Sequence, residues 1–118
     1  MALHNKLGKE AEEMAVSYLV KNGYEILHCN WRYSHYEIDI VAKKNDLLKI
    51  VEVKSLQSSA IRYPEQGVTK KKFKDLLKAA DQFLFRHREY RHVQFDILSI
   101  VVSQYRPPEF FLLEDVFL

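Results

Sequence analysis

The first part of the chain carries apolar residues at the three- and four-residue spacing of an amphipathic helix. They are Leu7, Ala11, Met14, Ala15 and Tyr18. This spacing predicts a helix over about residues 6–21, with Asn5 as its N-cap. At about 100° per residue, Glu10 lies on the shoulder of the apolar stripe, whereas Glu12 and Glu13 point away from it. We therefore expect Glu10 to be the acidic residue of this helix that faces inward.

Segments rich in β-branched and aromatic residues follow, separated by polar breaks. Residues 24–31 predict a first strand. Residues 36–43 and 47–54 predict two further strands, which the short polar segment 44–46 would join as a hairpin. The chain is therefore expected to continue from its first helix into three consecutive strands.

Apolar residues return at helical spacing in the second half of the chain. They are Phe73, Leu76, Leu77, Ala80, Phe83 and Leu84. They predict a helix that is capped by Thr69 and ends between residues 86 and 89. The nearly continuous apolar run 93–102 predicts a strand covered on both faces. Two prolines separate it from the apolar tail 109–118, which predicts an edge strand.

The predicted order of elements is therefore α, β, β, β, α, β, followed by the tail. Because a helix connects the third and fourth strands, we expect those two strands to be parallel, in contrast to the antiparallel hairpin. This predicts an α/β fold in which helices flank a mixed sheet. The 118 residues are expected to form a single domain, 1–118.

Composition favours a folded protein in a reducing compartment. Hydrophobic residues make up 47% of the chain and charged residues 29%, which is typical of a domain with a packed core. The single cysteine, Cys29, excludes a disulfide within the chain. The sequence shows neither a signal-peptide pattern nor a run of roughly 20 apolar residues. We expect a cytoplasmic protein with no membrane partner.

Acidic and basic residues alternate with apolar ones along both strands of the predicted hairpin. A two-residue turn at Asn45-Asp46 places Asp39 opposite Glu52. The same register places Glu37 opposite Lys54, and side-chain alternation puts all four on one face of the sheet. The residues expected on the other face are Ile38, Ile40, Val51 and Val53. A register shifted by one residue would break the direct pairing but keep the alternation.

Opposed carboxylates in a partly buried place repel each other unless a cation neutralises them. Mg²⁺ and Mn²⁺ take oxygen ligands and keep open positions for water and a phosphate oxygen. Phosphodiester hydrolysis uses such an ion to activate water and to stabilise charge that develops on the phosphate. Lys54 would orient the water or neutralise the same charge. The alternative is a solvated hairpin face with an ordinary Glu-Lys pair.

Several short segments form a more specific pattern than these acidic residues alone. They are Gly8-Lys9-Glu10-Ala11, Tyr18-Leu19, Gly23-Tyr24-Glu25-Ile26-Leu27, Asn30-Trp31-Arg32, Glu37-Ile38-Asp39-Ile40-Val41-Ala42, Val51-Glu52-Val53-Lys54, Val68-Thr69-Lys70-Lys71-Lys72 and Phe95-Asp96-Ile97-Leu98. In order and spacing they resemble the YraN-like family of small bacterial proteins, over roughly residues 6–100. That family is assigned to the restriction-endonuclease-like PD-(D/E)xK superfamily and is similar in arrangement to archaeal Holliday-junction resolvases.

The resemblance implies a restriction-endonuclease-like αβββαβ core and a DNA endonuclease that depends on Mg²⁺ or Mn²⁺, with branched or structured DNA as the expected partner. By that likeness, Asp39, Glu52 and Lys54 match the metal-binding and catalytic triad. Glu10 matches an additional acid that the first helix contributes to catalysis and metal binding. Glu37, in the Glu-Ile-Asp motif, is a further catalytic candidate.

Positive charge is concentrated in residues 69–91, which hold eight Lys or Arg residues and three acidic ones. The net charge of the whole chain is only +2. We expect this helix to contact the phosphate backbone of DNA, together with its own N-terminus. The expected contact residues are Lys70, Lys71, Lys72 and Lys74. A solvated helix face is the alternative.

Two other readings of the whole chain remain open. The protein would be a non-catalytic nucleic-acid-binding or protein-interaction module that retains the nuclease fold, or it would form a homodimer through the apolar tail 110–118. Three aromatic residues near the predicted hairpin have two possible roles, to stack on unpaired bases or to form the core and its rim. They are Trp31, Tyr33 and Tyr36.

Overall fold

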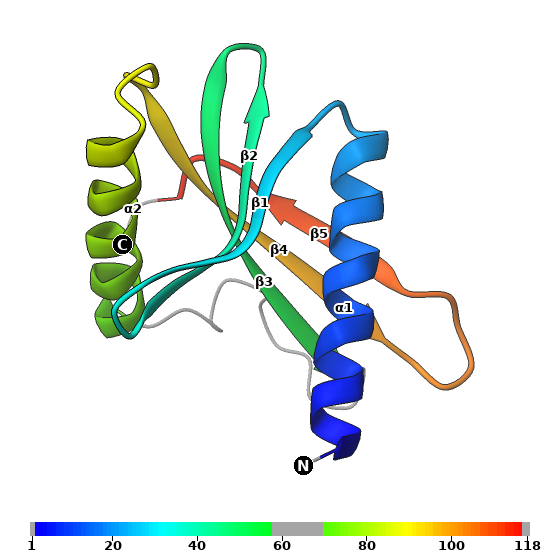
Figure 1. Cartoon of the computed structure of the whole chain (residues 1–118). Helices are drawn as coiled ribbons and strands as arrows, with labels where there is room; N and C mark the ends of the chain where they lie inside the picture. Colours follow the sequence, from blue (N-terminus) through cyan, green and yellow to red (C-terminus); the bar gives the residue numbers. More distant parts are fainter. Residues whose placement is uncertain (1, 58–69, 117–118) are drawn as a thin grey trace.

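The structure is a computed structural model that describes residues 2–57 and 70–116. Its elements are α1 (Ala2–Lys21), β1 (Glu25–Tyr33), β2 (Tyr36–Lys44), β3 (Leu47–Gln57), α2 (Lys70–Arg86), β4 (Val93–Val102) and β5 (Glu109–Leu113). This order confirms the αβββαβ core and the α/β class (Figure 1). Because α1 begins at Ala2, Asn5 lies inside the helix, and the prediction that it caps the helix is wrong. Thr69, the predicted cap of α2, lies outside the described residues.

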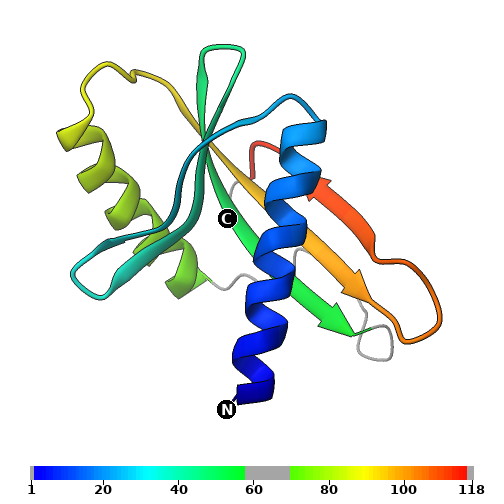
Figure 2. The same ribbon diagram turned by 45° about the vertical axis from the view of Figure 1, so that its right-hand side comes forward.

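The five strands form one mixed sheet in the order β1-β2-β3-β4-β5. β3 and β4 are parallel, as the helix between them predicts, and the other neighbours are antiparallel. β5 is an edge strand, also as predicted, although it ends at Leu113. Figure 2 shows the same sheet from a second direction, with α1 and α2 on different sides of it.

Each helix covers one face of the sheet and builds its own apolar cluster. The buried residues on the α1 side, called the α1 cluster, are Ala11, Ala15, Leu19, Tyr24, Ile40, Ala42, Val51, Leu98 and Ile100. The buried residues on the α2 side, called the α2 cluster, are Ile38, Val41, Leu48, Ile50, Leu76, Ala79, Ala80 and Phe83. Full burial of a Leu, Ile or Phe side chain is worth about 1.5–3 kcal/mol, so both clusters hold the central strands in place. In the described part of the chain, no helix is long and apolar enough to span a membrane.

The β2–β3 hairpin has the predicted turn. Asn45 and Asp46 have φ angles of 52° and 65°, in the left-handed region that short polar side chains tolerate. The pairs run from Lys44 with Leu47 to Ile40 with Val51, which confirms the predicted register over this part of the hairpin. The ladder ends at that last pair. The predicted direct pairings of Asp39 with Glu52 and of Glu37 with Lys54 are therefore wrong.

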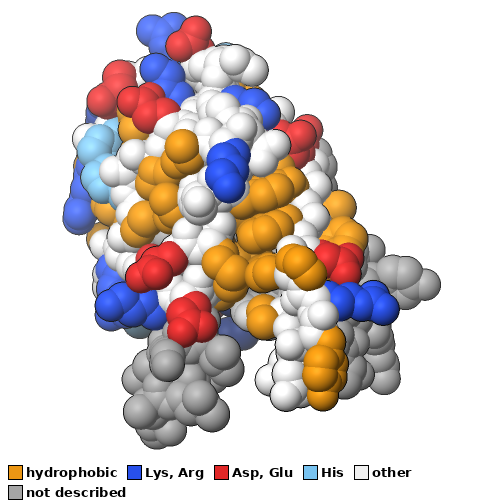
Figure 3. All heavy atoms as spheres, turned by 90° about the vertical axis from the view of Figure 1, so that its right-hand side faces the viewer, with side chains coloured by type: hydrophobic (Ala, Val, Ile, Leu, Met, Phe, Trp, Pro, Cys, Tyr) orange, Lys and Arg blue, Asp and Glu red, His pale blue; other side chains and the backbone are white. Residues whose placement is uncertain are grey.

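Two side chains of β5, Phe110 and Leu112, are partly buried against the α1 side of the sheet. The Phe110 ring stacks on Tyr18 of α1 with ring centroids 4.6 Å apart, and Leu112 packs against the α1 cluster. Phe111 points outward and is 42% exposed. Figure 3 shows the face that bears α1 and β5, where hydrophobic side chains gather near the middle and charged ones lie around them. The homodimer through this tail stays a prediction.

A buried charged network joins the segment after β5 to the sheet. Lys49 Nζ lies 3.3 Å from Asp96 Oδ2 and 3.3 Å from Glu114 Oε1. The Tyr24 hydroxyl donates to Asp96 Oδ2 at 3.0 Å or to Glu114 Oε1 at 3.1 Å. The Asp115 backbone N–H donates to Asp96 Oδ1 at 3.0 Å. Both side chains of the central ion pair, Lys49 and Asp96, are at least 95% buried, so this network is part of the core.

Candidate functional site

Asp39 lies where the regular pairing of β2 is interrupted on both sides. The β1–β2 pairs include Ile40 and Ile38 but pass over Asp39, and the β2–β3 ladder ends at Ile40. The Asp39 carboxylate instead accepts a hydrogen bond from the Val53 backbone N–H at 2.8 Å. The side chain thus satisfies a backbone donor at the point where β2 and β3 separate. This interruption opens the space in which the other polar residues meet.

Ile38 and Ile40 pack on opposite faces of the sheet. Ile38 belongs to the α2 cluster, whereas Ile40 belongs to the α1 cluster with Val51. Regular alternation would place residues two apart on the same face. The prediction that Ile38 shares a face with Ile40 is therefore wrong, because the strand is irregular at the intervening Asp39.

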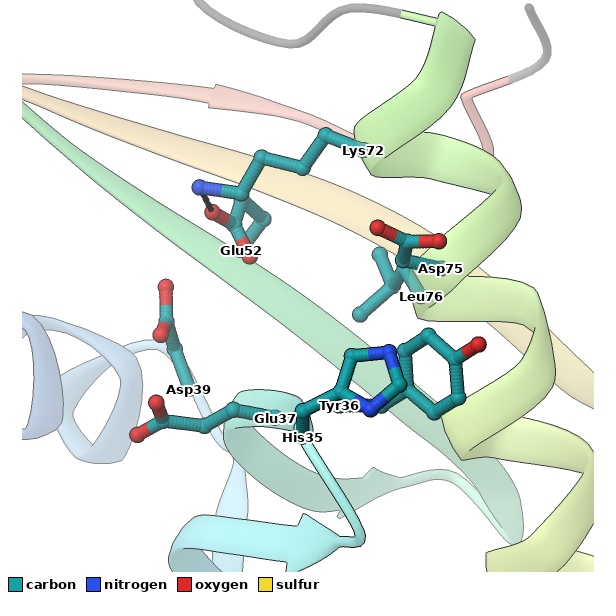
Figure 4. Close-up of a pocket in the computed structure, with 8 residues that line it drawn as sticks. All are labelled: His35, Tyr36, Glu37, Asp39, Glu52, Lys72, Asp75 and Leu76. Atoms are coloured by element: carbon teal, nitrogen blue, oxygen red, sulfur yellow. Dashed lines mark ion pairs between the residues drawn. The ribbon is translucent and has the colours of Figure 1, made fainter.

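Glu52 of β3 borders the same space as Asp39, on the face of the sheet that α2 covers. Its side chain is only 3% exposed, and its Oε1 forms an ion pair with Lys72 Nζ of α2. Figure 4 shows Asp39 and Glu52 on neighbouring strands, with Lys72 reaching to Glu52 from the first turn of the helix. Two carboxylates and an ammonium from three elements thus meet at one place.

The surroundings of Asp39 shift the pKa of its carboxyl group. Burial, followed by the negative charge of Glu52, raises the pKa of Asp39 to about 6. The Val53 N–H and the positive charge of Lys72 act in the opposite direction but do not cancel the rise. A carboxyl group that is hard to ionise beside another carboxylate marks a position where an added positive charge would be stabilised.

Two lysines at this site have pKa values shifted in opposite directions. Burial, together with hydrogen bonding to Lys72 and its charge, lowers the pKa of Lys54. Burial alone would also lower the pKa of Lys72, but the hydrogen bond and charge of Glu52 outweigh it and leave that pKa above its ordinary value. Lys54 therefore lies within reach of the cluster, as its position two residues after Glu52 predicts.

Two hollows meet at Glu37 and Asp39. The hollow on the α2 side has a volume of about 210 Å³, and its other lining residues are His35, Tyr36, Glu52, Lys72, Asp75 and Leu76. The hollow on the α1 side has a volume of about 490 Å³, and its other lining residues are Gly8, Ala11, Glu12, Asn30, Val53 and Ser55. Glu37 and Asp39 thus border hollows on both faces of the sheet, and Glu52 borders the hollow on the α2 side.

The acidic residue that α1 contributes to this region is Glu12. Glu10 is exposed and lines neither hollow, so the prediction that it faces inward is wrong. Glu12 lines the α1-side hollow, and its Oε1 accepts a hydrogen bond from the Asn30 side chain. Asn30 has a φ of 54°, so the backbone of β1 departs from the extended conformation beside Asp39. The docking of α1 decides which shoulder of its apolar stripe meets the site.

The predicted phosphate-contacting lysines do not share one environment. Lys71 and Lys74 are exposed on α2, whereas Lys72 reaches to Glu52. Lys70 is the first residue of α2, and its side chain lies outside what the structure describes. The sequence placed Lys72 on a binding surface but did not indicate its contact with Glu52, because that contact joins residues of two elements that are 20 positions apart in the chain.

The aromatic residues near the hairpin divide between core and site. Trp31 packs edge-to-face against the buried Phe83, with ring centroids 5.3 Å apart, and therefore belongs to the α2 cluster. Tyr36 lines the α2-side hollow, with His35 tilted against it at 4.1 Å and Lys78 Nζ 5.6 Å from its ring. Tyr36 is therefore the residue of this group that borders the acidic site.

The donor set at this site can be tested for a divalent metal ion. Among the described residues, no cluster of three His, Cys, Asp or Glu side chains is placed to hold one. Asp39 and Glu52 nevertheless fit a hard cation, because Mg²⁺ is commonly held by one or two carboxylates and completes its shell with water and phosphate oxygens. Burial and then the negative charge of Glu52 raise the pKa of Asp39, and such a cation would offset the repulsion between the two carboxylates.

These features define a class of protein: an αβββαβ domain with paired carboxylates and lysines at the point where the central hairpin opens. A family model described as Uncharacterised protein family UPF0102 matches residues 11–100. The chain belongs to this family, which confirms the YraN-like resemblance.

The relatives are similar to this chain over most of their length. A UPF0102 protein of Parabacteroides distasonis is 42% identical over 88% of this chain and 86% of its own. A UPF0102 protein of Bacteroides thetaiotaomicron is 44% identical over 86% and 84%, and one of Christiangramia forsetii is 40% identical over 88% and 87%. Their names state the family and assign no activity.

Proposed function

We propose that the protein is a DNA endonuclease that hydrolyses phosphodiester bonds with Mg²⁺ or Mn²⁺, on branched or otherwise structured DNA. The observation that carries the proposal is the placement of Asp39 beside the buried Glu52, with Lys54 and Lys72 at the same point. A fold by itself does not specify activity, so the proposal is based on these side chains.

Each residue has a chemical role in this proposal. Asp39 and Glu52 would hold the metal ion, which would lower the pKa of the attacking water and stabilise charge on the phosphate. Lys54 would orient the water or neutralise the developing charge. Glu37 borders both hollows and forms an ion pair with Arg32, whose Nη2 lies 3.7 Å from Glu37 Oε2. It is therefore a candidate to position water or substrate.

The basic helix supports DNA as the substrate. The first three residues of α2 are lysines, and its first turn holds no acidic residue. Lys72, at this end of the helix, lines the hollow on the α2 side. Phosphate groups bind favourably at helix N-termini and at clustered lysines. A phosphodiester held there would lie next to Asp39 and Glu52.

Cleavage of a substrate panel tests the activity. We expect wild-type protein with Mg²⁺ or Mn²⁺ to cut at least one substrate among linear duplex, single-stranded and branched DNA, and to cut none in EDTA. Asp46→Asn, in the exposed hairpin turn, should cut as the wild type does, because its side chain is 97% exposed and borders neither hollow. An intact panel with both metals would exclude the enzyme and favour a non-catalytic binding module.

The salt dependence of DNA binding tests the basic helix. Replacing the exposed Lys71 and Lys74 together with glutamine should weaken DNA binding and reduce the slope of log affinity against log salt concentration by about 2, since about one counterion is released for each neutralised phosphate. The matched control replaces the exposed Lys9 and Lys21 of α1, which carry the same charge. Equal slopes for all three proteins would restore the interpretation of α2 as a solvated face.

A further inference from the structure

Lys72 is a counter-ion to the two acidic residues of the site. Its ammonium forms an ion pair with Glu52 Oε1, and its positive charge also acts on Asp39. One ammonium therefore partly balances two carboxylates that repel each other. A divalent cation bound by the same carboxylates would do so more completely, because it brings twice the charge and accepts oxygen ligands from both.

The two partners of this ion pair differ in their freedom to move. The Glu52 side chain is 3% exposed and belongs to the central strand β3, whereas the Lys72 side chain is 46% exposed. Lysine carries its charge on a flexible stem of four carbons. The Lys72 side chain can therefore move with less disturbance of the core than the Glu52 side chain can, so an exchange of partners at this site would move Lys72 rather than Glu52.

The helix position of Lys72 supplies a second favourable partner. Lys70, Lys71 and Lys72 begin α2, and its first turn holds no acidic residue. Positive charge at a helix N-terminus is repelled by the helix dipole, whereas an anion there is attracted. A phosphate group near this turn would therefore attract Lys72 away from Glu52.

We propose that Lys72 is an exchangeable counter-ion, which pairs with Glu52 when no divalent cation is bound and turns to a DNA phosphate when one is. This inference rests on the proposed function, since it takes Glu52 as a metal ligand. Lys72 then opposes metal binding in the absence of DNA. Because coupling between two ligands is reciprocal, DNA that draws Lys72 away would strengthen metal binding.

Calorimetric titration with MnCl₂ alone tests this role. Lys72→Gln removes the competing charge, so we expect it to bind Mn²⁺ about tenfold more tightly than the wild type. Lys72→Arg keeps the charge and should keep the wild-type affinity. The control Lys78→Gln removes a charge from the same helix at a residue that lies over Tyr36, and should change the affinity less than about twofold.

The outcomes separate this inference from the proposed function. Equal or weaker Mn²⁺ binding by Lys72→Gln than by the wild type would overturn the counter-ion role and leave the proposed metal site in place. The absence of Mn²⁺ binding by wild type and variant alike would overturn both. The midpoint of thermal unfolding, measured without metal and with Mn²⁺, shows that each variant is folded and gives a second readout, because the tighter binder gains more stability.

Discussion

Replacing Glu52 with glutamine is expected to reduce metal-dependent DNA cleavage by about a thousandfold or more and to weaken Mn²⁺ binding. The substitution keeps the shape of the side chain but removes a charge that is 97% buried and faces Asp39. Metal-ligand charge of this kind stabilises the transition state by several kcal/mol, and each 1.4 kcal/mol is a factor of about ten in rate. Initial cleavage rates on the preferred substrate of the panel would measure this loss.

The Glu52 variant has a matched control, and its expected change in Mn²⁺ affinity is opposite to that of Lys72→Gln. Glu25→Gln, at an exposed position of β1, makes the same chemical change and should keep wild-type rates. Glu52→Gln should weaken Mn²⁺ binding, whereas Lys72→Gln should strengthen it, although both break the same ion pair. Cleavage by Glu52→Gln at the wild-type rate would exclude Glu52 as a metal ligand and would direct attention to Glu12 and Glu37 in the other hollow.

Replacing Lys49 with methionine is expected to lower the free energy of unfolding by about 3–5 kcal/mol. The change removes the cation that faces Asp96 at 3.3 Å and leaves a carboxylate that is fully buried. The Tyr24 hydroxyl and the Asp115 N–H would still hydrogen bond to Asp96, but neither carries a charge to balance it. Urea denaturation at pH 7 would measure the loss.

Two further variants test whether the loss of stability in Lys49→Met comes from an unbalanced buried charge. Lys43→Met breaks the exposed ion pair with Asp46 and should cost less than about 1 kcal/mol. Adding Asp96→Asn to Lys49→Met removes the charge left behind and should recover part of the stability. A double variant that is less stable than Lys49→Met would contradict this explanation. Tyr24 belongs to the same network: burial and then the charge of Asp96 raise the pKa of its hydroxyl.

The elements were predictable because each depends on a local pattern. Apolar residues at helical spacing predicted α2 to within a few residues of its end, and the continuous run 93–102 predicted β4 with its observed bounds. Asn45 and Asp46 predicted the tight turn between β2 and β3, because both tolerate the left-handed backbone that it needs. The parallel pairing of β3 with β4 followed from the helix between them.

The site was predictable only in part. Alternation along the two strands predicted that Asp39, Glu52 and Lys54 lie on one face of the hairpin. The structure brings these side chains close enough to affect one another. The same alternation failed for Ile38, because it assumes a regular strand and the pairing of β2 is interrupted at Asp39. The choice of Glu10 failed because a helical wheel gives the angle between residues but not how the helix is docked.

By itself, the sequence determined the order of the helices and strands, the register near the hairpin turn and the presence of paired carboxylates on neighbouring strands. Those features depend on residues that are close together in the chain. Only the tertiary structure decided that Lys72 contacts Glu52 and that Glu12 borders the site. Both contacts depend on how α1 and α2 dock on opposite faces of the sheet, which the packing of their apolar side chains decides.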